Sequence, residues 1–390
     1  MEESKKKTLE ILVVFNSLLG TIGGGSRHII EVADFWCESH KIDFLISRMS
    51  YEVAREHLNK KPCPNKNVIV YSVPFDNRKN TLIVYLSRIV KNILISSKFK
   101  NKYDIIIAPN YLPQNLIPAI FLKKNSKLVA YFHTTPPFVR KEYLKKNFLR
   151  RVISSLNWEL CVFLTKIAFD LVFVINNVTR TYFIEKGFSP ESVITVTNGI
   201  HYDEILEIKP TKKEYDGVFL GRLVQNKGIF DLIKIWKIVT EKFPLAKLCV
   251  IGDGFEKANL SKKIKEEKLE ENIILVGQKE GKEKYNLMKK SKVFVYPSYY
   301  ESQGVVLMEA IACNLAVVAY YLPTYEEFFG GNVMTVKIGS TEDMANKILE
   351  VLDSSKQNNN DNTNFIKKYN WEETANKQIL CIENLIKRNI

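Results

Sequence analysis

Two glutamates, Glu301 and Glu309, lie where a β-branched apolar run, residues 293–296, is followed by a helical pattern that begins near Gly304. This arrangement predicts that Glu301 lies in the loop after a strand and Glu309 about one and a half turns inside the helix. Carboxylates at two depths of one crevice can accept hydrogen bonds from ribose or sugar hydroxyls and fix their orientation. The amides of Gly304 and Val305 would point at a phosphate. The alternative is a pair of exposed acids that only stabilise a helix start.

A basic pair follows another apolar run, in the segment Gly221-Arg222-Leu-Val-Gln-Asn-Lys227-Gly228. Arg222 offers a planar fork for two phosphate oxygens and Lys227 a mobile point charge, so together they suit a diphosphate whose negative charge grows as a bond breaks. An arginine and a lysine in a loop are otherwise solvated charges, but a place between a strand and a helix favours an anion site. The strand-end turn Gly252-Asp253-Gly254 is either a structural turn or a wall of the same site.

A glycine-rich turn, Gly20-Thr-Ile-Gly23-Gly24-Gly25, follows the first apolar run and precedes Arg27, His28 and a helical pattern. Glycines let the backbone approach a ligand closely, and a helix N-terminus favours a phosphate, so Gly24 and Gly25 are candidate contacts. A merely tight turn is the alternative. The turn is a poor nicotinamide fingerprint, because His28 occupies the third glycine position of G-x-G-x-x-G counted from Gly23.

Short β-branched runs alternate with longer amphipathic segments, which predicts parallel sheets covered by helices on both faces. The first series of expected strands is 11–15, 43–46, 69–72, 104–108, 127–132, 171–175 and 193–196. The second series is 217–220, 247–251, 273–276, 293–296 and 316–319. Each series predicts a doubly wound domain, and the polar, proline-containing residues 210–216 are expected to link them. Near the end, the polar residues 354–363 are expected to form a loop, and an amphipathic helix is expected from Trp371 to about Arg388.

The bulk composition narrows the class of protein. With 390 residues and 46% apolar side chains, the chain can bury two cores. A net charge of +14 would suit nucleic acid, an anionic membrane or phosphorylated ligands, but lysines on solvated helices give the same total. Because no RRM, KH or helix-turn-helix signature accompanies the charge, no nucleic-acid partner is expected. The longest apolar region, 160–175, is interrupted by Lys166 and Asp170, which argues against a membrane-spanning helix.

The cysteines and acids give no sign of a metal or redox site. Six cysteines lie far apart, with no C-x-x-C pair, so reduced and mostly buried thiols in a cytoplasmic compartment are expected. No D-x-D motif follows a strand, so neither a metal nor any other cofactor is expected.

Taken together, these motifs resemble the retaining glycosyltransferases of family 4, also described as glycosyl transferases group 1, which have the GT-B fold. The resemblance rests on motifs in the order of that family: the glycine-rich turn with Arg27-His28, Tyr131-Phe-His133-Thr134, Val196-Thr-Asn198-Gly199-Ile200, Gly221-Arg222 with Lys227-Gly228, Gly252-Asp253-Gly254, and Glu301 with Glu309. It implies an α/β protein of two doubly wound Rossmann-like domains facing a central cleft. Residues 1–209 would bind the acceptor, residues 210–371 would bind the nucleotide sugar, and the helix 372–390 would return to the N-terminal domain.

The resemblance also implies roles for single residues. Arg222 and Lys227 would hold the donor diphosphate, Glu309 would contact the ribose, and Glu301 and His133 would approach the transferred sugar. The other implied donor contacts are Gly24, Gly25, Asn198, Gly221, Gly254, Gly304 and Val305. Arg27 and His28 are candidate acceptor contacts. The family commonly has Glu-Gly-Phe-Gly where this chain has Glu301-Ser302-Gln303-Gly304, and this departure leaves the identity of the sugar open.

The implied activity is transfer, with retention, of a hexose-type sugar from a nucleotide diphosphate sugar to a glycan or lipid-linked acceptor at the cytoplasmic membrane face. A UDP-sugar is the expected donor by family habit. A sugar-nucleotide 2-epimerase of the same architecture is the alternative, although the glutamate spacing and the basic pair favour transfer. Two basic stretches, 88–102 and 140–151, could lie on anionic lipid, but ordinary amphipathic helices packed on a sheet would look the same.

Overall fold

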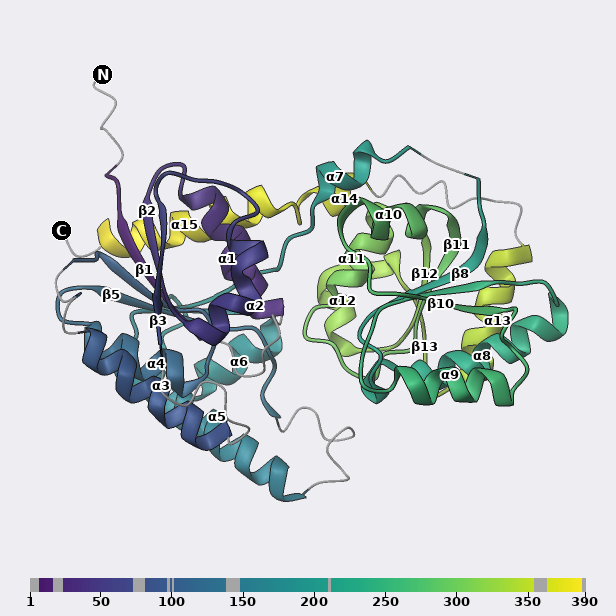
Figure 1. Ribbon diagram of the computed structural model, residues 1–390, viewed down its shortest axis with the longest axis horizontal. Helices are drawn as coiled ribbons and strands as arrows, with labels where there is room; N and C mark the ends of the chain where they lie inside the picture. The colour runs from purple at the N-terminus through teal and green to yellow at the C-terminus, as the bar shows by residue number, and fades with distance from the viewer. Residues whose placement is uncertain are drawn as a thin grey trace. The chain divides into compact units, whose positions relative to one another are not determined.

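The computed structural model describes residues 7–16, 24–72, 81–96, 99, 102–137, 148–209, 212–353 and 363–387. The chain divides into two compact units, Met1–Asn198 with Trp371–Ile390, and Gly199–Asn370 (Figure 1). This division falls earlier than the boundary expected after residue 209. The reason is local, because the Ile200 amide donates to the Tyr369 carbonyl at 2.8 Å and the next helix, α7 (Tyr202–Glu207), packs on helices of the second unit.

The first unit is built on a seven-stranded parallel sheet in the order β3-β2-β1-β4-β5-β6-β7. Its strands are β1 (Glu10–Phe15), β2 (Lys41–Ser47), β3 (Lys66–Tyr71), β4 (Ile105–Ala108), β5 (Lys127–Phe132), β6 (Leu171–Val174) and β7 (Val193–Thr195). Successive side chains of a strand point to opposite faces, so Ile11 and Val13 enter one core and Leu12 and Val14 the other. These strands match the series expected from sequence.

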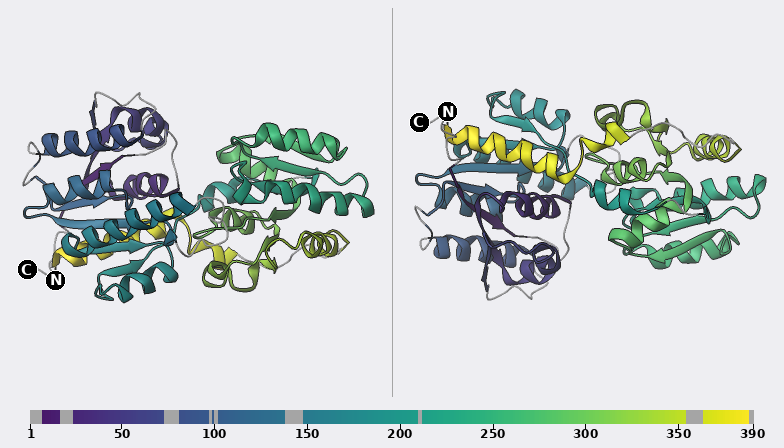
Figure 2. Two further views of the ribbon diagram at one scale, coloured as in Figure 1. Left: turned by 90° about the horizontal axis from the view of Figure 1, so that it is seen from below. Right: turned by 90° about the horizontal axis from the view of Figure 1, so that it is seen from above.

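Helices cover both faces of this sheet. One face carries α1 (Gly24–Trp36), α2 (Arg48–Leu58) and the C-terminal helix α15 (Trp371–Lys387). The other carries α3 (Thr81–Ser96), α4 (Pro113–Leu122), α5 (Phe148–Ala168) and α6 (Asn177–Glu185). Figure 2 shows α15 running alongside α1, where the Trp36 Nε1–H group donates to the Ala375 carbonyl at 2.9 Å. The expected return of the C-terminal helix to the first domain is therefore confirmed.

The second unit has a six-stranded parallel sheet in the order β10-β9-β8-β11-β12-β13. Its strands are β8 (Tyr215–Leu220), β9 (Leu248–Ile251), β10 (Ile273–Gly277), β11 (Ser291–Tyr296), β12 (Ala316–Tyr320) and β13 (Met334–Val336). Its helices are α7, η3 (Gln225–Lys227), α8 (Ile229–Lys242), α9 (Lys257–Glu266), α10 (Gly281–Lys289), α11 (Val305–Ala312), α12 (Pro323–Phe329), η4 (Gly330–Asn332), α13 (Thr341–Asp353) and α14 (Thr363–Lys367). The sequence did not predict β13, and the linker expected over 210–216 ends sooner because β8 begins at Tyr215.

The cysteine prediction is wrong for one pair. A disulfide joins Cys37, directly after α1, to Cys63, shortly before β3, with their Cα atoms 6.3 Å apart. Their separation in sequence gives no sign of this contact. It arises because Cys37 precedes β2, Cys63 precedes β3, and these two strands are neighbours in the parallel sheet. Cys161, Cys249 and Cys313 are buried free thiols, as expected, and burial raises the pKa of each to about 12.

Several segments that were singled out in the sequence lie wholly or partly outside the described residues. The glycine-rich turn lies mostly in residues 17–23, outside the described residues, but α1 already begins at Gly24. The low-complexity residues 354–362 and most of the basic stretch 140–151 are also outside the described residues. Within the other basic stretch, Arg88 is buried and donates to the Met49 sulfur at 3.2 Å, so it does not belong to a basic surface.

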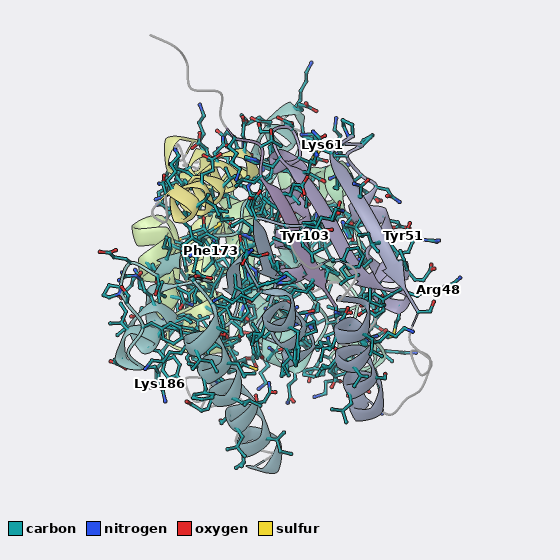
Figure 3. The ribbon with its side chains drawn as sticks, turned by 90° about the vertical axis from the view of Figure 1, so that its left-hand side faces the viewer. Arg48, Tyr51, Lys61, Tyr103, Phe173 and Lys186 are labelled. Atoms are coloured by element: carbon teal, nitrogen blue, oxygen red, sulfur yellow. A yellow bond between two sulfur atoms is a disulfide. The ribbon has the colours of Figure 1, made fainter. Side chains whose placement is uncertain are left out.

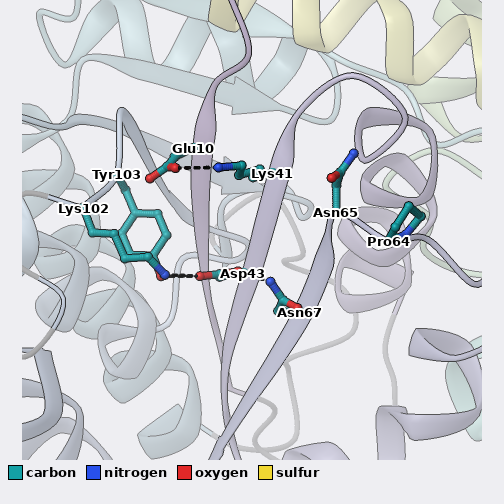
Figure 4. A pocket seen from close by; sticks show the side chains of 8 residues that line it. All are labelled: Glu10, Lys41, Asp43, Pro64, Asn65, Asn67, Lys102 and Tyr103. Carbon is teal, nitrogen blue, oxygen red and sulfur yellow. Dashed lines mark hydrogen bonds and ion pairs between the residues drawn. The ribbon is translucent and has the colours of Figure 1, made fainter.

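A shallow cavity of about 320 Å³ opens at the amino ends of β1, β2 and β3 (Figure 4). Asp43 accepts hydrogen bonds there from Tyr103 at 2.5 Å, Lys102 at 2.8 Å and Asn67 at 3.0 Å. These mutual bonds satisfy the carboxylate. Because ligands of doubly wound sheets bind at the carboxyl ends of the strands, this cavity lies at the wrong edge for the expected site.

Candidate active site

The residues singled out in the second unit follow two neighbouring strands. β8 and β11 lie side by side, and the strand order reverses between them, because β9 follows β8 on one side and β12 follows β11 on the other. Gly221 and Arg222 come directly after β8, and Glu301 lies in the loop after β11. In open α/β sheets the crevice beyond the carboxyl ends at such a reversal is the usual ligand site.

At this point of the sheet, Lys227 forms an ion pair with Glu301. The carboxylate also accepts hydrogen bonds from the Tyr296 hydroxyl at 2.5 Å and the Ser298 hydroxyl at 3.0 Å. Burial, together with the charge of Glu301, holds the pKa of Tyr296 well above its ordinary value, so the phenol stays protonated and donates. All these donors reach the same oxygen, Oε1, and among the described residues none reaches Oε2. Glu301 is thus fixed in place with one oxygen left to accept a further bond.

Glu309, on α11, is held through one carboxylate oxygen in a similar way. Its Oε1 accepts from the Lys284 ammonium at 2.7 Å and from the Tyr285 hydroxyl at 3.0 Å, both on α10. The side chain is about one-tenth exposed, and within the described parts of the chain its Oε2 has no hydrogen-bond donor. Lys284 could not be found from the sequence, because a lysine on an amphipathic helix has the pattern of a solvated charge.

The loop after β8 keeps its shape through close backbone approaches. Gly228 has φ 69°, and a Cβ built there would lie 1.9 Å from the Pro297 carbonyl oxygen. Gly252 has φ 147°, and its Cβ would lie 1.9 Å from the Gly221 carbonyl oxygen. Gly254 would meet the Leu223 carbonyl oxygen at 2.4 Å. Only glycine fits these positions, and the loops after β8, β9 and β11 are therefore tightly packed against one another.

A stability comparison tests this packing. Gly228→Ala is expected to lower the free energy of unfolding by about 3 kcal/mol or more, because it adds a steric clash with Pro297 to the cost of a positive φ. Gly277→Ala is the matched control, since Gly277 has φ 77° but open space around its Cβ, and should cost only about 1 kcal/mol. Urea denaturation of both variants measures the difference. Equal losses would show that the contact with Pro297 is not tight.

The remaining residues predicted to bind a donor in the second unit present groups that are open to a ligand. Arg222 is exposed, and among the described residues its guanidinium has no hydrogen bond or ion pair. Gly304, with φ 87°, caps α11, so Val305 is the first helical residue and its N–H group lacks an intrahelical acceptor. A guanidinium after β8 and a helix N-terminus after the neighbouring β11 are both groups that can bind an anion.

In the first unit, His133 directly follows β5 and packs against α1. A Cβ at Gly25 would lie 2.6 Å from the His133 ring, so glycine is required for this approach. The His133 ring lies 4.7 Å from the ring of His28 and stacks on Tyr131 at 5.3 Å, measured between centroids. The Nε2 atom of His133 is buried and has no hydrogen-bond partner among the described residues. A buried polar atom without a partner is what a ligand hydroxyl could satisfy.

His28 has a different position from the one expected. It is fully buried, with Nδ1 2.9 Å from the Asn198 side-chain oxygen and Nε2 3.0 Å from the Gln378 side-chain oxygen. The Tyr131 hydroxyl also donates to Gln378, at 2.8 Å. His28 therefore has no exposed surface for acceptor contact, whereas Arg27 is partly exposed and pairs with Glu31 at 3.3 Å. Gln378, on α15, was missed because its partners lie far away in the sequence.

The burial of His28 and His133 predicts that the stability of the protein depends on pH. Burial lowers the pKa of His28, and burial with the nearby His28 ring lowers the pKa of His133 well below its ordinary value. Below a pH of about 6.5 the unfolded chain takes up protons that the folded protein does not, so stability is lost as the pH falls further. The melting temperature should drop between about pH 7.5 and 5.5, and drop less in His133→Phe than in the wild type or in the control His57→Gln. The same slope in all three proteins would contradict a neutral, buried His133.

Two doubly wound parallel sheets define a protein of two Rossmann-like units, and the basic pair and fixed carboxylate lie at the reversal point of the second sheet. A model described as Glycosyltransferase Family 4 matches residues 22–204, and one described as Glycosyl transferases group 1 matches residues 203–383. The chain therefore belongs to the family 4 glycosyltransferases of the GT-B fold. The family models are of glycosyltransferases, so the epimerase alternative is not supported.

Relatives of known sequence and structure agree with this family. An uncharacterized glycosyltransferase of Methanocaldococcus jannaschii is 27% identical over 75% of this chain and 70% of its own length. A Campylobacter jejuni enzyme, N-acetylgalactosamine-N,N'-diacetylbacillosaminyl-diphospho-undecaprenol 4-alpha-N-acetylgalactosaminyltransferase, is 26% identical over 80% of each chain. Among solved structures, Anabaena HepE in complex with UDP and glucose has a TM-score of 0.70 at 18% identity, covering 95% of this chain and 98% of its own. Sucrose-phosphate synthase from Thermosynechococcus elongatus has a TM-score of 0.74 at 16% identity, covering 97% of this chain and 100% of its own. At these identities the structures establish the fold.

Proposed function

We propose that this glycosyltransferase moves a hexose-type sugar from a nucleotide diphosphate sugar to a glycan or lipid-linked acceptor, with retention at the anomeric carbon. The observation that carries the proposal is the arrangement at the ends of β8 and β11. Glu301 and Glu309 are each held through Oε1, and each keeps Oε2 for another donor. Ribose and sugar hydroxyls are such donors, and the exposed Arg222 suits the diphosphate between them.

The roles follow from the contacts. Arg222, Lys227 and the Val305 amide stabilise the diphosphate as the sugar leaves, because fixed positive charge is most effective where negative charge develops. Glu309 binds the ribose, and Glu301 orients both Lys227 and a hydroxyl of the transferred sugar. We propose same-face attack, in which an oxygen of the departing phosphate takes the proton of the acceptor hydroxyl. These cations supply the neutralisation that a divalent metal provides elsewhere, so transfer is proposed to be metal-independent.

In the first unit, we propose that His133 approaches the sugar through Nε2, and that the glycines at the start of α1 give a ligand close access to the backbone. His28 then orients His133 and Asn198 instead of touching the acceptor. A uridine donor is supported by the HepE complex with UDP, and a lipid-linked acceptor by the undecaprenol compound in the name of the Campylobacter relative. We also propose a cytoplasmic location, which the disulfide between Cys37 and Cys63 does not support.

Donor binding tests the proposal and names the nucleotide. The melting temperature of the protein is measured with UDP-, GDP- and ADP-sugars, each with EDTA present. One nucleotide class is expected to stabilise the protein by about 2.7 kcal/mol at a hundredfold excess over Kd, because a ligand that binds only the folded state raises its stability by mass action. The proposal is wrong if no nucleotide sugar raises the melting temperature, and its metal-independent part is wrong if Mn²⁺ is required.

A further inference from the structure

The helices on one face of the first sheet carry large apolar side chains on their outer surface. Figure 1 shows α3, α4 and α5 grouped on that side of the first unit, and α4 packs against both of its neighbours. On α5, Ile153, Leu156, Leu160, Phe163 and Ile167 are each between 50% and 66% exposed. On α3, Leu86, Val90 and Leu94 are between 53% and 64% exposed, and Phe121 of α4 is 56% exposed. We call these residues the apolar ridge.

The spacing on α5 shows that its part of the ridge is one continuous stripe. At 100° per residue its five members fall within an arc of about 80°. The opposite face of the same helix, with Trp158, Cys161 and Thr165, is fully buried in the core. An ordinary surface helix has a polar outer face, and contiguous exposed apolar surface marks a site of interaction. The outer face of α5 is therefore built for contact with something other than water.

The charged residues of the three ridge helices are mostly basic. α3 and α4 contain no aspartate or glutamate, and α5 contains only Glu159. Glu159 is neutralised, because it accepts from the Tyr182 hydroxyl at 2.6 Å and pairs with Lys186 at 2.8 Å, at the position labelled in Figure 3. Besides the buried Arg88, α3 carries Lys91, and α5 carries Arg150, Arg151 and the exposed Lys166. A second copy docked on the same face would oppose cations to cations, whereas an anionic surface would complement them.

We infer that the apolar ridge of α3, α4 and α5 lies in the headgroup region of an anionic lipid bilayer, with its apolar side chains in the acyl boundary. In this arrangement the helices lie along the membrane surface. No described helix is long and apolar enough to cross a membrane. This inference does not depend on the donor chemistry. The expected membrane contact of the stretch 88–102 is then made by the apolar residues of α3 and not by Arg88. Arg88 is buried, whereas the apolar residues face outward.

Vesicle sedimentation tests the inference with three proteins. The wild type is expected to pellet with phosphatidylcholine–phosphatidylglycerol vesicles and about tenfold less with phosphatidylcholine alone. The α5 triple variant Leu156→Gln, Phe163→Gln, Ile167→Gln should bind about a hundredfold more weakly, because its apolar contact is lost. The control Leu245→Gln, Phe255→Gln removes side chains that are 89% and 80% exposed in the second unit and should pellet like the wild type.

The outcomes separate this inference from the proposed function. The triple variant should melt like the wild type and keep the full donor-induced rise in melting temperature, because its three side chains are exposed and none of them is proposed to hold the donor. The inference is overturned if the wild type stays in the supernatant, or if the triple variant pellets as strongly as the wild type. It is also overturned if the wild type is a dimer that the triple variant converts to a monomer while neither binds vesicles, since the ridge would then be a protein interface.

Discussion

Replacing Arg222 and Lys227 together with alanine is expected to lower kcat for glycosyl transfer by about three orders of magnitude, since one lost donor to a developing anion already costs about a hundredfold or more. The Arg222 guanidinium has no protein partner among the described residues, and the Lys227 ammonium, which pairs with Glu301, has further N–H groups to donate to a diphosphate. The loss should appear in kcat more than in KM, because the charge to be stabilised grows as the bond breaks. Initial rates with saturating acceptor measure it.

The matched control for this variant is Lys234→Ala, Lys262→Ala, which removes two exposed cations of the same unit. It should turn over like the wild type. Thermal unfolding must show that the Arg222, Lys227 double variant is still folded, because Glu301 loses a partner. A folded double variant with near wild-type kcat would contradict the assignment of the basic pair.

Glu301→Ala is expected to lower kcat by about a hundredfold to a thousandfold, because it removes both the sugar contact and the anchor of Lys227. Tyr296→Phe keeps the carboxylate but deletes the 2.5 Å bond that fixes it, and should cost only about tenfold. Steady-state kinetics of both variants distinguish the effects. If Tyr296→Phe were as damaging as Glu301→Ala, Glu301 would act through the structure of the loop and not on the sugar.

The fold could be predicted well because its strands are short β-branched runs separated by polar breaks. The run 127–132 coincides with β5, and the runs 11–15 and 316–319 differ from β1 and β12 by one residue. β13 could not be found, since Met334–Val336 is only half-buried and too short to show an alternating pattern. The first residues of β8 were hidden in a polar segment that resembled a linker.

The candidate site could be predicted best where residues follow strands. Glu301 and Lys227 were found because both lie in loops at strand ends, and the sheet brings those ends together. Lys284 and Gln378 were missed because their partners come from distant segments and their own helices look solvated. His28 was a candidate acceptor contact on the family resemblance, yet the packing of α15 buries it. Tertiary packing, which local sequence does not encode, decides all of these cases.

The most direct test of the account is a proton NMR time course of the protein with a nucleotide sugar, in the presence and absence of a lipid-linked acceptor. We expect release of the nucleoside diphosphate only when acceptor is present, in step with a new glycosidic bond of the same anomeric configuration as the donor. Inversion at the anomeric carbon would contradict the retaining mechanism. Conversion of the nucleotide sugar into an epimer, or its breakdown without acceptor, would contradict glycosyl transfer itself.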